Sequence, residues 1–194
     1  KELFEFANKH KLAIGKIEDW ISYRLKNEKL IKLKKTDKIV IKDKKYQIKI
    51  FENQLDGSEH FALIKGKISP SKNTRVRVIS SNLVESYLLG KRLPNSFNNT
   101  LDYFKDYNNC ILVFIRDSNL KSVSSTLRDF KSDKKNKIGT DKLIRNYGIG
   151  AQIIKALKVK NMILVTRSPK KVIGLEGFGI RITKQEIIKW KKFV

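Results

Sequence analysis

The side chains that most often carry metal or nucleophilic chemistry are scarce in this sequence. It holds one cysteine, Cys110, and two histidines, His10 and His60, in 194 residues. Cys110 opens the unbroken apolar run at residues 110–115, which predicts a core residue rather than a metal ligand. His10 and His60 fall in separate segments and are not expected to meet. The sequence therefore offers no compact set of thiols and imidazoles for a transition metal.

Positive charge is abundant instead. Forty-three Lys and Arg residues oppose 19 Asp and Glu, which gives a formal net charge of +24. Such a charge attracts polyanions, so nucleic acids, nucleotide phosphates and acidic membrane surfaces are all candidate partners. Lysines are spread through every segment, whereas sequence-specific DNA readers concentrate arginine and aromatic residues. The charge is compatible with a basic nucleic-acid-binding module but does not require one.

Two glycines in the second half of the chain are candidates for phosphate binding. Gly148 and Gly150 stand beside a predicted helix, and glycines at a helix N-terminus let backbone N–H groups approach a phosphate. The same residues can instead serve a turn or close packing, which is the interpretation that we favour.

The elements that must position these residues change in character along the chain. Apolar residues at helical spacing predict helices before residue 31, and the lysine-rich stretch at residues 32–38 predicts a linker. Alternating residues then predict strands, with a turn at Asp56-Gly57. The predicted strands lie at residues 39–41, 46–51, 61–65 and 75–79.

The second half alternates between helices and strands. Helices are predicted at residues 97–107 and 122–130, from near Asp141 or after Gly150 to residue 157, and at 184–189; a short helix is also predicted to open at Ser168-Pro169. Buried strands are predicted at residues 110–115 and 162–165. The expected fold class is α/β: a mixed layered domain with a strand-rich first half and an alternating second half, preceded by short N-terminal helices.

The composition also bears on location. The longest apolar run is far shorter than the ~20 residues that a membrane-spanning helix needs. Charges interrupt every apolar stretch near the start, which argues against a signal peptide. Together with the single cysteine, these features predict a cytoplasmic protein with no membrane partner.

The last third of the chain resembles the GTP cyclohydrolase II domain of riboflavin biosynthesis. Residues 145–154 read RNYGIGAQII, residues 162–171 read MILVTRSPKK and residues 174–180 read GLEGFGI. Upstream, residues 56–66 (DGSEHFALIKG) and 75–78 (RVRV) are similar to the family's early strand motif and to the strand that enters its active site. The resemblance implies the fold of that family.

The N-terminal part carries a second resemblance, to the C-terminal helices of 3,4-dihydroxy-2-butanone 4-phosphate synthase. In bifunctional riboflavin proteins that synthase precedes the cyclohydrolase domain. The resemblance implies that residues 1–36 belong to the end of the synthase and a linker, and residues 37–194 to the cyclohydrolase II-like domain. It also implies a homodimer and a fused or associated synthase as partner. The start at Lys1, without Met, fits a fragment of such a fusion.

The family's zinc ligands are missing at the positions that the resemblance assigns to them. Three cysteines hold the zinc in the family, and the metal activates a bound water. Those positions here are Asn82, Leu93 and Asn95. A leucine cannot coordinate a cation, and amide oxygens are poor ligands for zinc. No cofactor is therefore expected.

Other functional positions of the family are only partly kept. The Glu and Arg that follow the central strand are absent, because residues 116–121 read RDSNLK. In the family's catalytic Asp-x-Arg pair, Arg145 matches the arginine, whereas the Asp position is Leu143 and Asp141 is at best a weak substitute. Shifting a carboxylate by two residues turns it to another face of a helix.

Some nucleotide-binding positions remain. Thr166 and Lys171 match residues that bind the guanine end of GTP in the family, and Arg77 lies in the motif that enters the active site. Arg77, Arg145 and Lys171 can together form a phosphate pocket. Each also has a purely structural interpretation, in a strand surface or a helix cap.

These observations predict a GTP cyclohydrolase II-like domain that is a pseudoenzyme. It is expected to be kept for structural, dimerisation or regulatory support of the fused synthase, with GTP or another nucleotide phosphate as a candidate ligand. Two alternatives stay open. One is a divergent active GTP cyclohydrolase II with a different metal or none, and the other is a basic nucleotide- or nucleic-acid-binding module.

Overall fold

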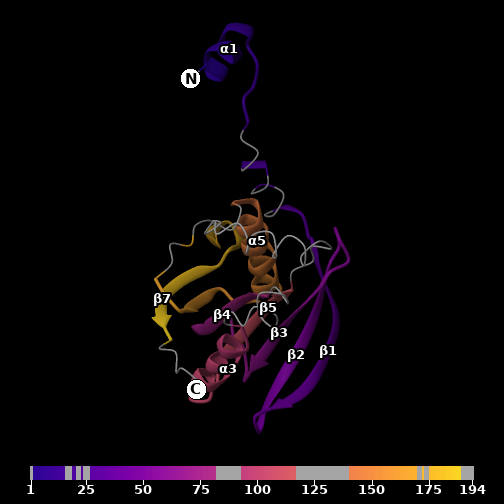
Figure 1. Ribbon diagram of the computed structural model, residues 1–194, viewed down its shortest axis with the longest axis vertical. Coiled ribbons are helices and arrows are strands. Elements are labelled where there is room, and N and C mark those ends of the chain that lie inside the picture. Colours follow the sequence, from indigo (N-terminus) through magenta and orange to yellow (C-terminus); the bar gives the residue numbers. More distant parts are fainter. Residues whose placement is uncertain are drawn as a thin grey trace, which may run out of the picture.

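The computed structural model contains a mixed sheet flanked by helices (Figure 1). It describes residues 2–15, 19–20, 23, 27–81, 93–116, 140–169, 172 and 175–188, with the backbone alone at 81, 93–95, 140–147 and 176. Within these residues the sheet has seven strands in the order β1-β2-β3-β5-β4-β6-β7. The predicted α/β class is confirmed.

The first three strands form an antiparallel meander. They are β1 (Ile31–Ile41), β2 (Lys44–Asn53) and β3 (Glu59–Lys65). Lys42 and Asp43 both have positive φ, 48° and 60°, which is the backbone geometry of a tight two-residue hairpin turn. Gly57, with φ 67°, serves the turn between β2 and β3 that the sequence predicts at Asp56-Gly57.

The second half of the sheet is parallel. Its strands are β4 (Thr74–Ser81), β5 (Cys110–Arg116), β6 (Asn161–Thr166) and β7 (Arg181–Ile187). β5 pairs antiparallel with β3 and parallel with β4, so it joins the two halves. β4 and β7 both run parallel to β6.

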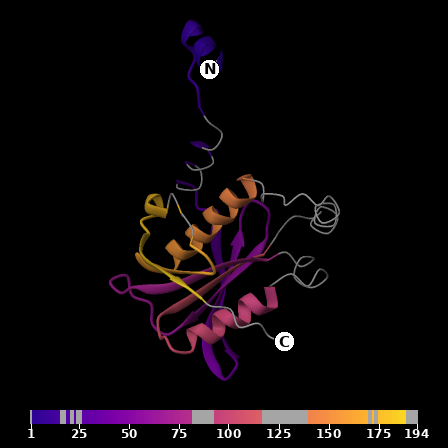
Figure 2. The same cartoon turned by 60° about the vertical axis from the view of Figure 1, so that its left-hand side comes forward.

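Two helices cover opposite faces of the sheet (Figure 2). Helix α3 (Leu93–Phe104) buries Leu101 and Phe104 on one face, and helix α5 (Thr140–Ala156) buries Ile149 and Ile153 on the other. Successive strand residues alternate between these two cores, as the period of a strand requires. The short 3-10 helix η2 (Leu175–Phe178) packs on the α5 side.

Helix α1 (Glu2–His10) lies apart from the sheet in both views (Figures 1 and 2). Its apolar residues Leu3, Phe4 and Phe6 are exposed. In the part of the chain that the structure describes, no helix is both long and apolar enough to cross a lipid bilayer.

Two secondary-structure predictions are wrong. The lysine-rich stretch at residues 32–38 is part of β1, because an edge strand leaves much of its surface to solvent and tolerates lysines there. Residues 184–187 extend β7 rather than form a helix, since pairing with β6 overrides the local pattern.

Other predictions lie beyond the described structure. The helix predicted at residues 122–130 lies outside the described residues. The predicted division at residue 36 falls inside β1, and the origin of residues 1–36 in a synthase domain stays a prediction.

Candidate functional site

The topology predicts a ligand site at the carboxyl ends of the central parallel strands. After β4 the chain proceeds to α3 on one face, and after the neighbouring β5 it proceeds to α5 on the other. Where adjacent parallel strands send their connections to opposite faces, a ligand site commonly opens beyond their carboxyl ends. Asn82, which directly follows β4, lies outside the described residues.

A small pocket lies at this end of the sheet, between β4, β6 and α5. Its volume is about 70 Å³. The lining is mostly apolar, and two polar residues, Arg77 and Thr166, contribute to it. The apolar lining residues are Val78, Gly150, Ala151, Ile154, Met162, Leu164, Val165, Val172 and Leu175. Two functional positions predicted from the sequence therefore meet in one pocket.

Arg77 occupies the gap where β4 and β6 stop pairing. The last paired residues are Val76 and Leu164, and beyond them the Arg77 guanidinium donates a hydrogen bond from Nη1 to the Val165 carbonyl at 3.0 Å. Its Nε is buried and has no hydrogen-bond partner among the described residues. Burial lowers the pKa of Arg77, and the positive charge of Arg167 lowers it further. An anion in the pocket would stabilise this charge.

Thr166 ends β6 and supplies the second polar group. Its side chain is only 2% exposed, yet its Oγ1 lacks a hydrogen-bond partner within the described part of the chain. The main chain is satisfied, since the Thr166 carbonyl accepts from the Ile188 amide at 2.9 Å. A buried hydroxyl left unpaired in a pocket is a functional-site signal, because such groups are costly to bury.

The remaining predicted catalytic positions lie at the start of α5. The helix begins at Thr140, so positions 141 and 145 are one turn apart on the same side, and position 143 faces away. The family's spacing is not kept, because Asp141 precedes Arg145 by four residues rather than two. Leu93 and Asn95 occupy the first turn of α3. Lys171 lies outside the described residues.

The phosphate-cradle interpretation of Gly148 and Gly150 is wrong. Both lie well inside α5 rather than at its N-terminus, so their amides are engaged in the helix. A Cβ placed on Gly150 lies 3.4 Å from Cδ1 of Ile115 and 3.5 Å from Cγ1 of Val78. Gly150 therefore serves the close packing of α5 on the sheet, the interpretation that the sequence favours.

The donor atoms of the described residues do not fit zinc. Cys110 is fully buried at the amino end of β5, level with Arg75 and remote from the pocket. Burial raises the pKa of its thiol to about 11, whereas a zinc ligand must be a thiolate. Among the described residues, no group of three or more His, Cys, Asp or Glu is arranged to hold a metal ion. The core role predicted for Cys110 is confirmed.

His60, for which the sequence predicts only the absence of a metal-binding role, lies at the carboxyl end of β5. Its ring is 1% exposed, and Nδ1 accepts a hydrogen bond from the Arg116 amide at 3.2 Å. Nε2 lies 3.3 Å from Ser58 Oγ, which donates to Asp56 Oδ1 at 2.6 Å. Burial lowers the pKa of His60, so the ring is neutral and holds the carboxyl end of β5. Its period-two spacing from Ala62 and Ile64 was a signal that it points inward.

Comparison with known proteins places these observations in a family. The family profile described as GTP cyclohydrolase II matches residues 34–186. The chain is 29% identical over 200 residues to riboflavin biosynthesis protein RibBA of Aquifex aeolicus, covering 97% of this chain and 49% of that protein. It is 30% identical over 192 residues to the probable monofunctional riboflavin biosynthesis protein RIBA 3, chloroplastic, of Oryza sativa subsp. japonica, covering 93% and 36%.

A solved structure is similar over nearly the whole chain. It is RibBX from A. baumannii, described as a two-domain 3,4-dihydroxy-2-butanone 4-phosphate synthase. The TM-score is 0.66 at 25% sequence identity, and the match covers 97% of this chain and 49% of that one. The chain thus spans about half the length, or less, of the relatives that it matches.

Proposed function

We propose that this chain, which belongs to the GTP cyclohydrolase II family, is a non-catalytic form of the GTP cyclohydrolase II domain. It is a GTP cyclohydrolase II-like domain of the kind found in riboflavin biosynthesis proteins. In this proposal it supports a dihydroxybutanone phosphate synthase, to which it is fused or bound, by structural, dimerising or regulatory means.

The donor set is the observation that carries the proposal. Asn82, Leu93 and Asn95 stand at the positions of the family's zinc ligands, and Leu93 offers no donor atom. The single cysteine is buried at the opposite end of β5. His60 is engaged by Arg116 and Ser58, so it is not free to replace a lost ligand. Without an activated hydroxide, attack on the purine ring lacks a nucleophile at neutral pH.

Two of the similar proteins support a role for this domain next to a synthase domain. RibBX is described by its synthase activity and as having two domains, and this chain is similar to about half of it. RibBA of Aquifex aeolicus likewise extends well beyond the part that this chain covers. A region similar to this chain can therefore make up half of a protein whose description names the synthase activity.

A retained nucleotide phosphate is the second part of the proposal. Arg77 and Thr166 line one pocket, and each has a donor without a partner among the described residues, which suits an anionic group. The described pocket is small, about 70 Å³, against roughly 300 Å³ or more for a pocket that holds a whole drug-sized ligand. It therefore accommodates one phosphate or a small polar group, and GTP is the first nucleotide to test.

Metal content and turnover test the catalytic part. We expect the purified chain to contain no stoichiometric zinc by plasma mass spectrometry and to release no formate from GTP. One equivalent of zinc together with formate release would overturn the proposal and favour the divergent-enzyme alternative. The triple variant Asn82→Cys/Leu93→Cys/Asn95→Cys is the matched control, because restoring three thiols should restore zinc binding.

The assembly part is tested separately. Sedimentation velocity of the chain is expected to show a homodimer, the state that the resemblance implies. A monomer across the accessible concentration range would remove dimerisation from the proposed role and leave the structural and regulatory roles.

A further inference from the structure

Residues 28–30 connect the N-terminal segment to the sheet and are held from two sides. On one side, the Leu30 carbonyl accepts a hydrogen bond from the Gln54 amide at 2.8 Å. On the other side lies Gln152 of α5, which is 122 residues away from Leu30 in the sequence. The Leu30 side chain is itself buried. The direction in which the chain leaves the sheet is therefore defined at this short connector.

Gln152 uses both ends of its amide on the connector backbone. Its Oε1 accepts from the Leu30 amide at 3.0 Å, and its Nε2 donates to the Glu28 carbonyl at 3.0 Å. A C=O and an N–H that flank one residue are the groups that a neighbouring β-strand would bond. The Gln152 side chain thus takes the place of one residue of an extra strand, and its two bonds fix the orientation of the connector.

Gln152 lies where the N-terminal segment meets α5. The segment before the connector holds α1, which lies apart from the sheet (Figures 1 and 2). The apolar side chains of α1 at Leu3, Phe4 and Phe6 are exposed. The family profile begins at residue 34, whereas the matches to relatives cover 93–97% of the chain and so extend into that segment. The same turn of α5 places Gly150, Ala151 and Ile154 in the wall of the pocket.

We propose that Gln152 is a positioning residue that sets the direction in which the N-terminal segment leaves the cyclohydrolase II-like body. A side chain that only stabilised the body would affect its unfolding and leave that direction unchanged. The inference rests on the proposed function only in expecting a synthase domain ahead of β1. Its test involves no metal, nucleotide or turnover, so each proposal can fail without the other.

The experiment measures the position of the segment in the full chain by electron spin resonance. Spin labels are attached at Tyr23→Cys in the segment and Gln47→Cys on β2, both of which are exposed. Native Cys110 is fully buried with a raised thiol pKa, so it stays unlabelled. We expect a narrow distribution of label-to-label distances with Gln152 present and a broad one in Gln152→Met.

Amide hydrogen exchange supplies the second readout. Loss of the bond to Gln152 should make the Leu30 amide exchange about five-fold faster. Gln54→Met is the matched control, because it makes the same chemical change beside the connector and keeps the backbone bond to Leu30. It should leave the distance distribution and the Leu30 exchange unchanged.

The outcomes separate a positioning role from a stabilising one. A broad distance distribution already present with Gln152, or one unchanged in Gln152→Met, overturns the proposal even if the midpoint of thermal unfolding falls. Should Gln152→Met fail to fold, Gln152→Glu decides. It keeps the acceptor for Leu30 but turns an oxygen toward the Glu28 carbonyl, so it should also broaden the distribution.

Discussion

Arg75 and Arg77, two residues apart on β4, lie in different environments. Arg75 lies near the amino end of the strand, where its Nε is 3.0 Å from a carboxylate oxygen of Glu186 and its guanidinium stacks 3.7 Å from the centre of the Tyr107 ring. Arg77 lies in the middle of the strand, just beyond the last residue paired with β6; its guanidinium bonds a backbone carbonyl, and its buried Nε has no partner among the described residues. Two arginines on one strand therefore have different surroundings and different roles.

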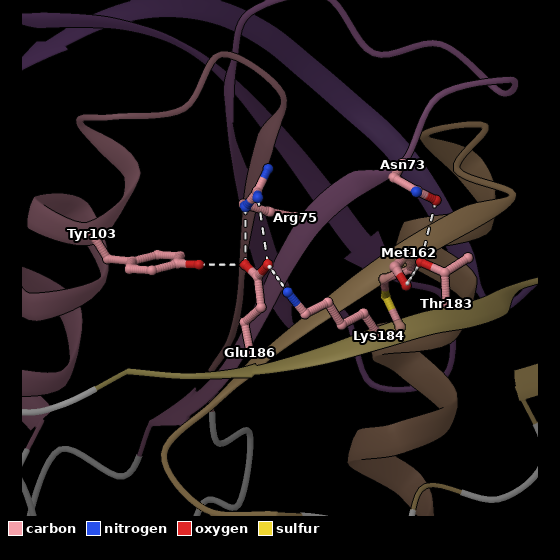
Figure 3. A network of polar contacts seen from close by, with 7 residues as sticks. All are labelled: Asn73, Arg75, Tyr103, Met162, Thr183, Lys184 and Glu186. Carbon is pink, nitrogen blue, oxygen red and sulfur yellow. Dashed lines mark hydrogen bonds and ion pairs between the residues drawn. The ribbon is translucent and has the colours of Figure 1, made fainter.

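The Arg75 cluster is a completed structural network (Figure 3). Glu186 of β7 also accepts a hydrogen bond from the Tyr103 hydroxyl of α3 and pairs with Lys184 at 3.3 Å. Burial acts to raise the pKa of the Glu186 carboxyl, but the bonds from Tyr103 and Arg75 outweigh it and hold that pKa below its usual value. The cluster ties β7 and α3 to the centre of the sheet.

The contrast teaches how to recognise a ligand site in this fold. Evolved interiors pair their buried charges, as the Arg75 cluster does, because an unpaired buried charge is costly. Arg77 in the middle of β4 and Thr166 at the carboxyl end of β6 have buried donors without a partner among the described residues. The Thr74 hydroxyl at the amino end of β4 also lacks a described partner, but it does not line the pocket, whereas Arg77 and Thr166 do. That incompleteness at the carboxyl ends of parallel strands is what we expect of a site whose ligand supplies the missing contacts.

Breaking the completed network should have the largest effect. Glu186→Gln leaves Arg75 without its counter-charge and should lower the free energy of unfolding by about 2–3 kcal/mol. Urea denaturation monitored by circular dichroism measures it. Glu52→Gln is the matched control, because Glu52 pairs with Lys34 at the solvent-exposed surface, where such pairs contribute less than about 1 kcal/mol. Equal losses in the two variants would mean that the Arg75 cluster is no stronger than a surface pair.

Removing Arg77 should have the opposite profile. Arg77→Met removes a partly buried charge that has no ion-pair partner among the described residues, so the free energy of unfolding should change by no more than about 1 kcal/mol. If the pocket holds a nucleotide phosphate, affinity for GTP should fall by about tenfold or more, the effect of one charge-assisted hydrogen bond. Calorimetric titration with GTP and Mg²⁺ measures this affinity.

Arg75→Met is the matched control for Arg77→Met, since it makes the same change two residues away. It should lower stability and leave the affinity of the folded protein for GTP unchanged. If both variants lost affinity equally, or if neither did, the assignment of a ligand site to the Arg77 end alone would be wrong.

The sequence predicted the strands of the sheet better than the side-chain contacts that distinguish the two ends of the sheet. Continuous apolar runs revealed the buried strands β5 and β6, because each core residue leaves a local signal. The lysines of β1 and the polar residues of β7 gave no such signal, since their strands depend on pairing with distant neighbours. Family resemblance, and not spacing, pointed to Arg77 and Thr166.

The contacts of Gln152 and His60 could not be predicted from the local sequence for the same reason. Gln152 bonds residues more than 120 positions away, and His60 bonds Arg116 across the sheet. A sequence window contains only one partner of each pair. The Arg75–Glu186 ion pair, 111 residues apart, was equally invisible.

The smallest expected effect is a difference in how the two regions of the sheet, around His60 and around Glu186, depend on pH. The pKa of His60 is lowered in the fold from an ordinary value of 6.5, so the unfolded chain binds the proton more readily. The stability contributed by neutral His60 is therefore complete above pH 6.5 and is lost as the pH falls below it. The pKa of Glu186 is lowered from 4.5, so its contribution persists until the pH falls below that value. The carboxyl end of the sheet should weaken first on acidification.

Hydrogen exchange between pH 7.5 and 5 tests this order, after correction for the intrinsic pH dependence of exchange. The Arg116 amide, which bonds His60, should lose protection before the amides of β7 near Glu186. In His60→Gln the amide has no imidazole to lose, so its protection should become independent of pH across 6.5. Simultaneous loss at both ends would show that the two regions open as one cooperative unit, because a single global opening exposes all of these amides together.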